Sequence, residues 1–426
     1  MSKKRRPPDY ISLPGTMVWF YALVSVFVLP LVYSRKVIDS TLTPKFILLA
    51  SLLLLFCIVL IYKSGKHQSL DVGSVFRQWP VLSWAAFLLL SVLSLLVAYN
   101  PWEGIFDVFR AGLSLIFLIL TTMILQLGKT IRPFLLSAMA LTAVMVVVGF
   151  GQYFAHVFGA TDLQALYKME GLFSHKNVFS GILFLMVPML SYPVLRGNRW
   201  EAGIAGLLLG LDLTLLMVLQ TRSLWLAVIV FTVVLIVLLW MNRRRWSVSG
   251  KLSLPGRPGF LPLILLLAVI AGSGLTHFSL QKASHSQAAA VQPRLPITGL
   301  GERAASIFDN QTDNRQKRIV IWRYTLRMIS DAPLLGVGAG NWKLLAPGYY
   351  DPDYMKTYYH NWRRPHNDFL LVLAEKGVPG LLAFLGFFLS AAWYALRVIR
   401  KQESPEKRLL VILAAGGIAG FMVDAL

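Results

Sequence analysis

The sequence predicts an all-α polytopic membrane protein. Hydrophobic residues make up 56% of the 426 residues, and the mean hydropathy is +0.62. Apolar runs of about 20 residues recur along the chain, and a helix of that length crosses a hydrocarbon layer of roughly 30 Å. The 41 basic residues are also unevenly distributed, with clusters in alternate loops.

The first apolar run follows a basic stretch at residues 3–6. No small-residue cleavage site follows this run and it is long enough to span, so we interpret it as an anchor helix and not as a signal peptide. The later runs are similar in length and contain few charges. The expected spans are 15–33, 45–62, 79–99, 105–127, 133–158, 178–195, 202–219, 223–241, 258–280, 378–399 and 409–426.

The basic residues give the orientation. If the N-terminus is inside and the spans alternate, about half of the 41 basic residues fall in inside segments and few in the short outside loops, which is the positive-inside pattern. The net charge of +21 is then a property of the loops. We expect membrane lipids around the protein and no nucleic-acid partner, because the sequence indicates no soluble basic face.

One long outside segment divides the chain into three parts. We expect transmembrane helices in residues 1–280, the long loop in 281–377 and the last transmembrane helices in 378–426. Long loops cross the membrane largely regardless of charge, so the many basic residues of this loop do not contradict the orientation. Its first part, residues 281–298, is rich in Ala, Ser, Gln and Pro.

Residues 312–331 of the loop predict an amphipathic helix on the outer membrane face or against the spans. Its apolar positions are Ile319, Trp322, Leu326 and Ile329, with Tyr324 and Met328.

A glycine-rich run follows at residues 334–342. It lacks the Gly-Lys-Ser/Thr ending of a phosphate loop and no βαβ pattern surrounds it, so we predict a tight turn with close backbone packing. The next tyrosines are at positions 349, 350, 354, 358 and 359. They are typical of an interfacial aromatic belt, and a sugar-stacking surface is the alternative.

The most informative stretch begins at Arg363. Pro365 suits the first helical turn and Gly377 suits the residue after a helix end, so about three turns of helix are expected between them. His366 then lies in the first turn, where the helix dipole and the charges of Arg363 and Arg364 disfavour the imidazolium form. A neutral imidazole can accept a proton from a hydroxyl nucleophile. The alternative is a histidine that caps the helix or packs.

A metal site at these residues is disfavoured. His360 and His366 are six residues apart, with Asp351, Asp353 and Asp368 nearby. This spacing matches no standard metal-binding pattern. We therefore expect no metal and no cofactor.

Two arginines offer an anion site at the outer membrane face. Arg222 lies in the very short outside connection 220–223 between two apolar helices, and Arg318 lies at the start of the amphipathic helix. Guanidinium groups bind phosphate in a bidentate manner, and a lipid diphosphate would present its charge at this depth. For either arginine alone, a side chain that reaches the lipid headgroups is the alternative.

Charged residues within the expected spans have two explanations. Asp107 and Arg110 are three residues apart on one helix and share a face, which favours a structural pair. Asp212 lies mid-span without a sequence-local partner, and an intramembrane carboxylate suggests a function. It would suit a proton-coupled transporter, although no inverted repeat or pair of broken helices is evident in the sequence.

Several short motifs stand in order along the chain. They are 171–177 (Gly-Leu-Phe-Ser-His-Lys-Asn), 221–223 (Thr-Arg-Ser), 318–322 (Arg-Ile-Val-Ile-Trp), 333–338 (Pro-Leu-Leu-Gly-Val-Gly), 365–369 (Pro-His-Asn-Asp-Phe) and 375–380 (Glu-Lys-Gly-Val-Pro-Gly). Together they resemble the O-antigen ligase and polymerase superfamily. The similarity is specific over residues 314–382, and the layout of many spans with one large late loop agrees with it elsewhere.

The resemblance implies a bacterial inner-membrane glycosyltransferase with a GT-C-like fold, no metal and an active site that faces the periplasm. Many relatives carry a further span, so we expect that the sequence is cut short after Leu426 and that about 11–12 transmembrane helices occur with one large periplasmic loop. The donor would be a glycan on undecaprenyl diphosphate. The implied site consists of His366 as the general base, Arg222 and Arg318 as ligands of the diphosphate, and Asn177, Arg364, Asn367 and Asp368 in supporting positions.

Three functional hypotheses follow. The leading one is ligation of O-antigen to lipid A core in lipopolysaccharide assembly. An O-antigen or exopolysaccharide polymerase, or a protein O-oligosaccharyltransferase, would use the same donor and share every motif, so the acceptor stays open among lipid A core, a growing glycan and a protein. A lipid or solute transporter is the hypothesis from another class.

Overall fold

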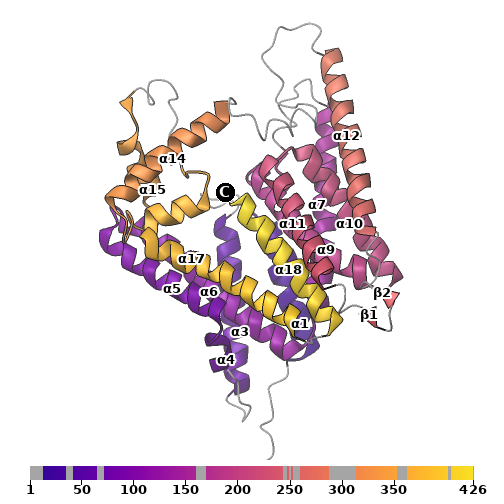
Figure 1. Ribbon diagram of the computed structural model, residues 1–426, viewed down its shortest axis with the longest axis horizontal. Helices are drawn as coiled ribbons and strands as arrows, with labels where there is room; N and C mark the ends of the chain where they lie inside the picture. The colour runs from indigo at the N-terminus through magenta and orange to yellow at the C-terminus, as the bar shows by residue number, and fades with distance from the viewer. Residues whose placement is uncertain are drawn as a thin grey trace, which may run out of the picture. The chain divides into compact units, whose positions relative to one another are not determined.

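The computed structural model describes residues 13–34, 42–64, 72–159, 169–242, 247–248, 251–252, 260–286, 313–352, 362–401 and 404–425. The basic stretch 3–6, most of the expected Ala/Ser/Gln/Pro-rich segment and the segment 353–361, with His360, Asp353 and three of the tyrosines, lie outside the described residues. The chain forms two compact units. Figure 1 labels the main helices and the two strands. Unit 1 consists of Met1–Phe134 and Lys317–Ala391, and unit 2 of Leu135–Gln316 and Ala392–Leu426.

Unit 1 contains the N-terminal helices and the helices that follow the long loop. Its elements are α1 (Gly15–Ala22), the π-helical η1 (Leu23–Val28), α2 (Leu29–Leu31), α3 (Leu42–Ser64), α4 (Val72–Phe76), α5 (Trp79–Leu93), η2 (Ser94–Val97), α6 (Pro101–Gly128), most of α14 (Asp313–Asp331), α15 (Trp342–Leu345), η4 (Ala346–Tyr349) and the first part of α17 (Asp368–Arg400). Helices α5, α6 and α17 pack through aromatic side chains. The indole of Trp84 donates a hydrogen bond to the Ala111 carbonyl at 3.1 Å, and its ring lies 6.3 Å from that of Phe384.

Unit 2 is a bundle of long helices. Its elements are α7 (Arg132–Gly159), α9 (Lys176–Arg196), α10 (Arg199–Leu219), α11 (Arg222–Met241), α12 (Phe260–Ser286), α18 (Pro405–Asp424) and the antiparallel pair β1 (Ser247–Val248) and β2 (Lys251–Leu252). The glycines of α18 allow it to lie close to α9 and α11 (Figure 1). A side chain at Gly420 would collide with the Phe184 ring and the Ala227 carbonyl.

The expected fold class is confirmed. Nine helices among the described residues are long and apolar enough to cross a membrane, and every expected span lies on a helix. The first expected span is a shorter apolar helical run, Gly15–Leu31, and the last expected span lies on α18 (Pro405–Asp424), which is not among the nine, so the expected count of 11–12 stays a prediction. The expected division at residues 280 and 377 follows membrane topology and stays a prediction.

Candidate functional site

The glycine-rich run packs its backbone against the break in α17. The amide of Val337 donates to the Ala374 carbonyl at 2.8 Å, and the amide of Gly338 donates to the Glu375 carbonyl at 3.1 Å. These carbonyls end a helical segment and have no intrahelical partner of their own, so the run satisfies them. The predicted tight turn with close packing is confirmed.

The break in α17 depends on Gly377. This residue has φ of 67° and ψ of −174°, a conformation that is open essentially to glycine alone. Its Cα also lies against the Leu334 carbonyl, where a side chain would collide. The predicted helix end at Gly377 is therefore confirmed, and a second helical segment continues from Val378.

The predicted position of His366 in the first helical turn is wrong. Helix α17 begins at Asp368, because the side chain of Asn367 accepts a hydrogen bond from the Leu370 amide at 2.9 Å and so serves as the N-cap. His366 lies before this cap with a left-handed backbone, φ of 57°. Asn is a strong capping residue and His is not, which explains why the helix starts later than Pro365 suggested.

His366 is held between two fixed residues. The carbonyl of the buried Pro365 accepts a hydrogen bond from the Trp322 indole at 2.9 Å, and Asn367 on the other side is 8% exposed. The imidazole itself is exposed, and its ring meets the Trp362 ring at 5.0 Å in an edge-on arrangement of 87°. The backbone is thereby fixed while the ring is presented at the surface.

Helix α14 is present, as predicted, but its buried face differs from the expected stripe. The buried side chains are Ile321, Tyr324, Thr325 and Met328, whereas Ile319 and Leu326 are exposed. This face packs on α15, η4 and α17 through residues such as Trp342 and Ala374. The buried stripe lies two residues after the predicted one. The sequence pattern did not distinguish the two, because both faces of the helix carry apolar residues.

Arg318 is exposed on α14. Arg318 lies one turn before Trp322 on α14, and the Trp322 indole donates a hydrogen bond to the carbonyl of Pro365, the residue before His366. Within unit 1, Arg318, Trp322 and the His366 segment therefore lie along one end of α14. Arg364 and Asp368 are also exposed and flank the His366 segment. Unit 1 thus contains every predicted site residue except Asn177 and Arg222.

Asn177 and Arg222 lie in unit 2, where the starts of α9 and α11 meet. Ser180 of α9 and Thr221, which precedes α11, pair through their hydroxyl oxygens at 3.1 Å. Asn177 is exposed at the start of α9, whose N-cap is His175. The expected short connection before Arg222 is present, since only two residues separate α10 from α11. The convergence of Arg222 with His366 stays a prediction.

A charge cluster with Lys376 and Glu375 buried and Asp107 and Arg110 partly buried is the largest feature that the sequence did not predict in full. The predicted Asp107–Arg110 pair is confirmed at 2.8 Å. Lys376 of α17 joins it, with its Nζ 2.9 Å from Asp107 Oδ2 and 3.4 Å from Glu375 Oε2. Glu375 also accepts a hydrogen bond from the Trp342 amide at 3.2 Å, so it ties the end of the glycine-rich run to α17. The sequence signal for this contact was the adjacent charged pair Glu375-Lys376 within an apolar region.

Asp212 is different. It lies fully buried on α10, and neither carboxylate oxygen has a hydrogen-bond partner among the described residues. It lies inside the candidate span Arg199–Leu219, as predicted.

The described tyrosines of this region pack against one another and donate hydrogen bonds to carboxylates. Tyr350 is buried against the Tyr324 ring at 5.3 Å, so its face does not contribute to a sugar-stacking surface. Hydrogen bonds from Arg327 at 3.1 Å and from the Tyr324 hydroxyl at 3.0 Å hold the pKa of Asp351 below its usual range. Burial raises the pKa of Tyr324.

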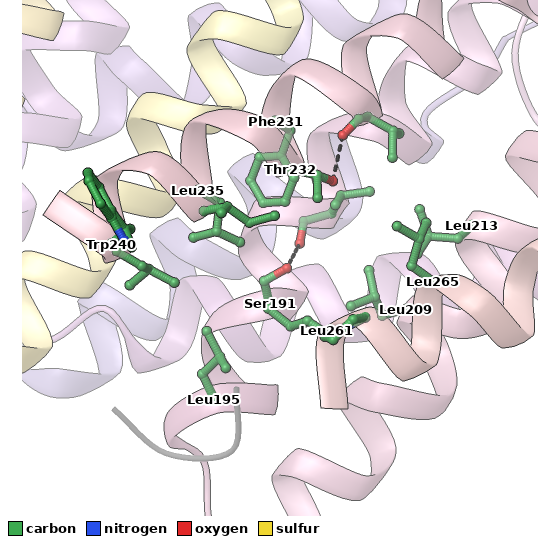
Figure 2. A pocket seen from close by; sticks show the side chains of 15 residues that line it. Ser191, Leu195, Leu209, Leu213, Phe231, Thr232, Leu235, Trp240, Leu261 and Leu265 are labelled. Carbon is green, nitrogen blue, oxygen red and sulfur yellow. Dashed lines mark hydrogen bonds between the residues drawn. The ribbon is translucent and has the colours of Figure 1, made fainter. Parts of the chain in front are cut away.

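Unit 2 also contains an apolar cavity of about 510 Å³ between α9, α10, α11 and α12 (Figure 2). Its hydroxyl groups are satisfied locally, because Ser191 donates to the Val187 carbonyl and Thr232 to the Val228 carbonyl, each at 2.7 Å. No predicted site residue lines it. Within the described ranges, no three His, Cys, Asp or Glu side chains come close enough to hold a metal ion.

Comparison with known families gives one assignment. A family model described as O-antigen ligase matches residues 204–385, a segment that contains Arg222, Arg318 and His366. A search of curated proteins finds no match for the chain. The resemblance found in the motifs is therefore confirmed, and the match supports a ligase or polymerase type of glycosyltransferase role. Residues 204–385 are therefore similar to the O-antigen ligase family, and this match supports a relation to the O-antigen ligase and polymerase superfamily.

Proposed function

We propose that this protein is an inverting, metal-independent glycosyltransferase of the bacterial inner membrane. It transfers a glycan from undecaprenyl diphosphate to an acceptor hydroxyl, and the acceptor is a sugar of lipid A core in lipopolysaccharide assembly. Residues 281–377 form its large periplasmic loop, and the active site faces the periplasm. The family match over residues 204–385 supports the reaction type.

His366 acts as the general base. Its neutral ring nitrogen accepts the proton of the acceptor hydroxyl while the hydroxyl oxygen attacks the glycosidic carbon of the donor. The bond between that carbon and the diphosphate oxygen breaks, and a single displacement inverts the carbon. The observation that carries this assignment is the exposed imidazole on a backbone fixed by Trp322 and by the Asn367 cap.

The leaving diphosphate needs positive charge. Arg222 and Arg318 bind it and stabilise the charge that develops as the glycosidic bond breaks. Asn177 and Arg364 support this site from exposed positions, and Asn367 and Asp368 hold the start of α17.

Reconstituted glycan transfer tests the proposal. The purified protein in lipid vesicles receives a labelled glycan on undecaprenyl diphosphate together with lipid A core. We expect His366→Ala to lose about 10²–10⁴ of the transfer rate, the range of a general base. His277→Ala, an exposed histidine of α12, is the matched control and should transfer normally. Normal transfer by a folded His366→Ala protein would show that the base assignment is wrong.

The same assay separates the acceptors. Lipid A core, a second donor molecule and a pilin-like protein are offered together, and the labelled product identifies a ligase, a polymerase or a protein O-oligosaccharyltransferase. The carboxylate of Asp212, which has no hydrogen-bond partner in the part of the chain that the structure describes, favours a transporter as the second candidate. A transporter would move its substrate at the normal rate when His366 is replaced.

A further inference from the structure

We infer that Asp424 of α18 is a positioning residue for Arg222. The inference rests on the proposed role of Arg222 as a ligand of the donor diphosphate. Asp424 lies outside the segment matched by the family model, and it belongs to the same unit as Arg222.

The start of α11 lacks the usual side-chain cap. Thr221 occupies the N-cap position, but its side chain makes no capping hydrogen bond. Its hydroxyl pairs with Ser180 of α9 at 3.1 Å, and both residues are buried. The residue before Arg222 is therefore tied to a neighbouring helix.

The residue after Arg222 is tied to a second helix. The Ser223 hydroxyl donates a hydrogen bond to Asp424 Oδ1 at 2.7 Å. Hydrogen bonds to a carboxylate are stronger than those between neutral groups. The other oxygen, Asp424 Oδ2, faces Gly181 of α9, where an added Cβ would lie 4.0 Å away.

Helix α18 is itself held firmly. Gly416, Gly417 and Gly420 are buried and allow close contact with Phe231, Pro188 and Phe184. Asp424 lies one turn after Gly420 and so shares this packed face. The carboxylate is therefore delivered to the start of α11 by a helix that has little freedom to move.

These contacts have one consequence for the arginine. Arg222 is flanked by two hydroxyl contacts, Thr221 to α9 and Ser223 to α18, which fix its backbone before substrate binds. A guanidinium that is aimed in advance loses less entropy when it binds a diphosphate. Asp424 thus acts through Arg222, and its negative charge also suits the positive end of α11.

Donor kinetics and a double-mutant cycle test the inference. We expect Asp424→Ala and Ser223→Ala each to raise the KM for the undecaprenyl-diphosphate donor about tenfold, as befits one hydrogen bond to a charged group. The acceptor KM should stay unchanged, whereas kcat should also fall, because Arg222 stabilises the charge on the leaving diphosphate. The double variant should be no worse than either single one, because both remove the same contact. Asp424→Asn keeps an acceptor oxygen and should recover part of the loss.

The controls separate this inference from the proposed function. Glu406→Gln changes the other carboxylate of α18, which pairs with Arg196 at 3.5 Å, and should leave the donor KM unchanged. Arg222→Ala should raise the donor KM. If it does while Asp424→Asn, Asp424→Ala and Ser223→Ala do not, the inference is wrong and the proposed function stands. If Arg222→Ala has no effect on the donor KM, the donor site and this inference are both wrong. Additive effects of Asp424→Ala and Ser223→Ala would also contradict it.

Discussion

Two carboxylates inside transmembrane helices have opposite surroundings. Asp107 on α6 contacts Arg110 and Lys376, and Lys376 in turn contacts Glu375. Asp212 on α10 has no hydrogen-bond partner among the described residues. The first set balances two negative with two positive charges, whereas the second is a lone carboxyl group. A buried ion pair and an isolated buried carboxylate therefore predict different responses to mutation.

The difference originates in the backbone. Lys376 and Glu375 reach Asp107 and Trp342 because α17 breaks at Gly377, beside the glycine-rich run. Helix α10 is continuous through Asp212 and has no comparable irregularity. Irregular backbone in unit 1 thus brings charged groups together, while regular packing in unit 2 leaves Asp212 among apolar helix surfaces.

Breaking the cluster should have the largest effect. Lys376→Met leaves Asp107 and Glu375 without their shared cation, and removing one partner of a buried pair costs about 3–5 kcal/mol. We expect a strong fall in the thermal unfolding midpoint in detergent and little folded protein in the membrane. Lys343→Met is the matched control, because its ion pair with Glu103 is partly exposed and should cost about 1 kcal/mol or less.

A double variant distinguishes charge balance from packing. Lys376→Met with Glu375→Gln removes one charge of each sign and keeps an oxygen for the Trp342 amide. It should be more stable than Lys376→Met alone. A double variant as unstable as the sum of both single changes would mean that the lysine acts through packing and not through its charge.

Neutralising Asp212 should have a much smaller effect. Asn matches the shape of Asp, and the substitution removes no hydrogen bond among the described residues. Asp212→Asn should therefore change the free energy of unfolding by about 1 kcal/mol or less, in the stabilising direction. The measurement is the thermal unfolding midpoint of the purified Asp212→Asn protein. Asp107→Asn is measured beside it, and its unfolding midpoint should be lower than that of the wild type. A large loss in Asp212→Asn would show that the carboxylate has a partner.

The sequence predicted what depends on local pattern. Apolar runs located the spans, and the spacing of Asp107 and Arg110 predicted their pair. The pattern did not predict that Lys376 completes that pair from a distant part of the chain, or that Ser223 meets Asp424, because periodicity carries no information on tertiary partners. The prediction placed His366 in the first helical turn because Pro365 suggested an early start. Asn367 caps the helix instead, so His366 lies before it.

The exposed ion pair between Arg327 and Asp351 shows how much pairing contributes to stability without burial. Its removal should have the smallest effect of these changes. The carboxylate of Asp351 pairs with Arg327 at 3.1 Å in solvent, and its pKa lies below the usual range. Its contribution to stability is therefore present above the unfolded pKa of about 3.9 and is lost as the pH falls through the lower folded value. We expect Asp351→Asn to unfold slightly earlier than the wild type at pH 6, with the difference shrinking as the pH falls below about 3.9 and also shrinking in high salt. A difference that stays unchanged as the pH falls well below that value would mean that Asp351 acts through a contact that does not depend on its charge.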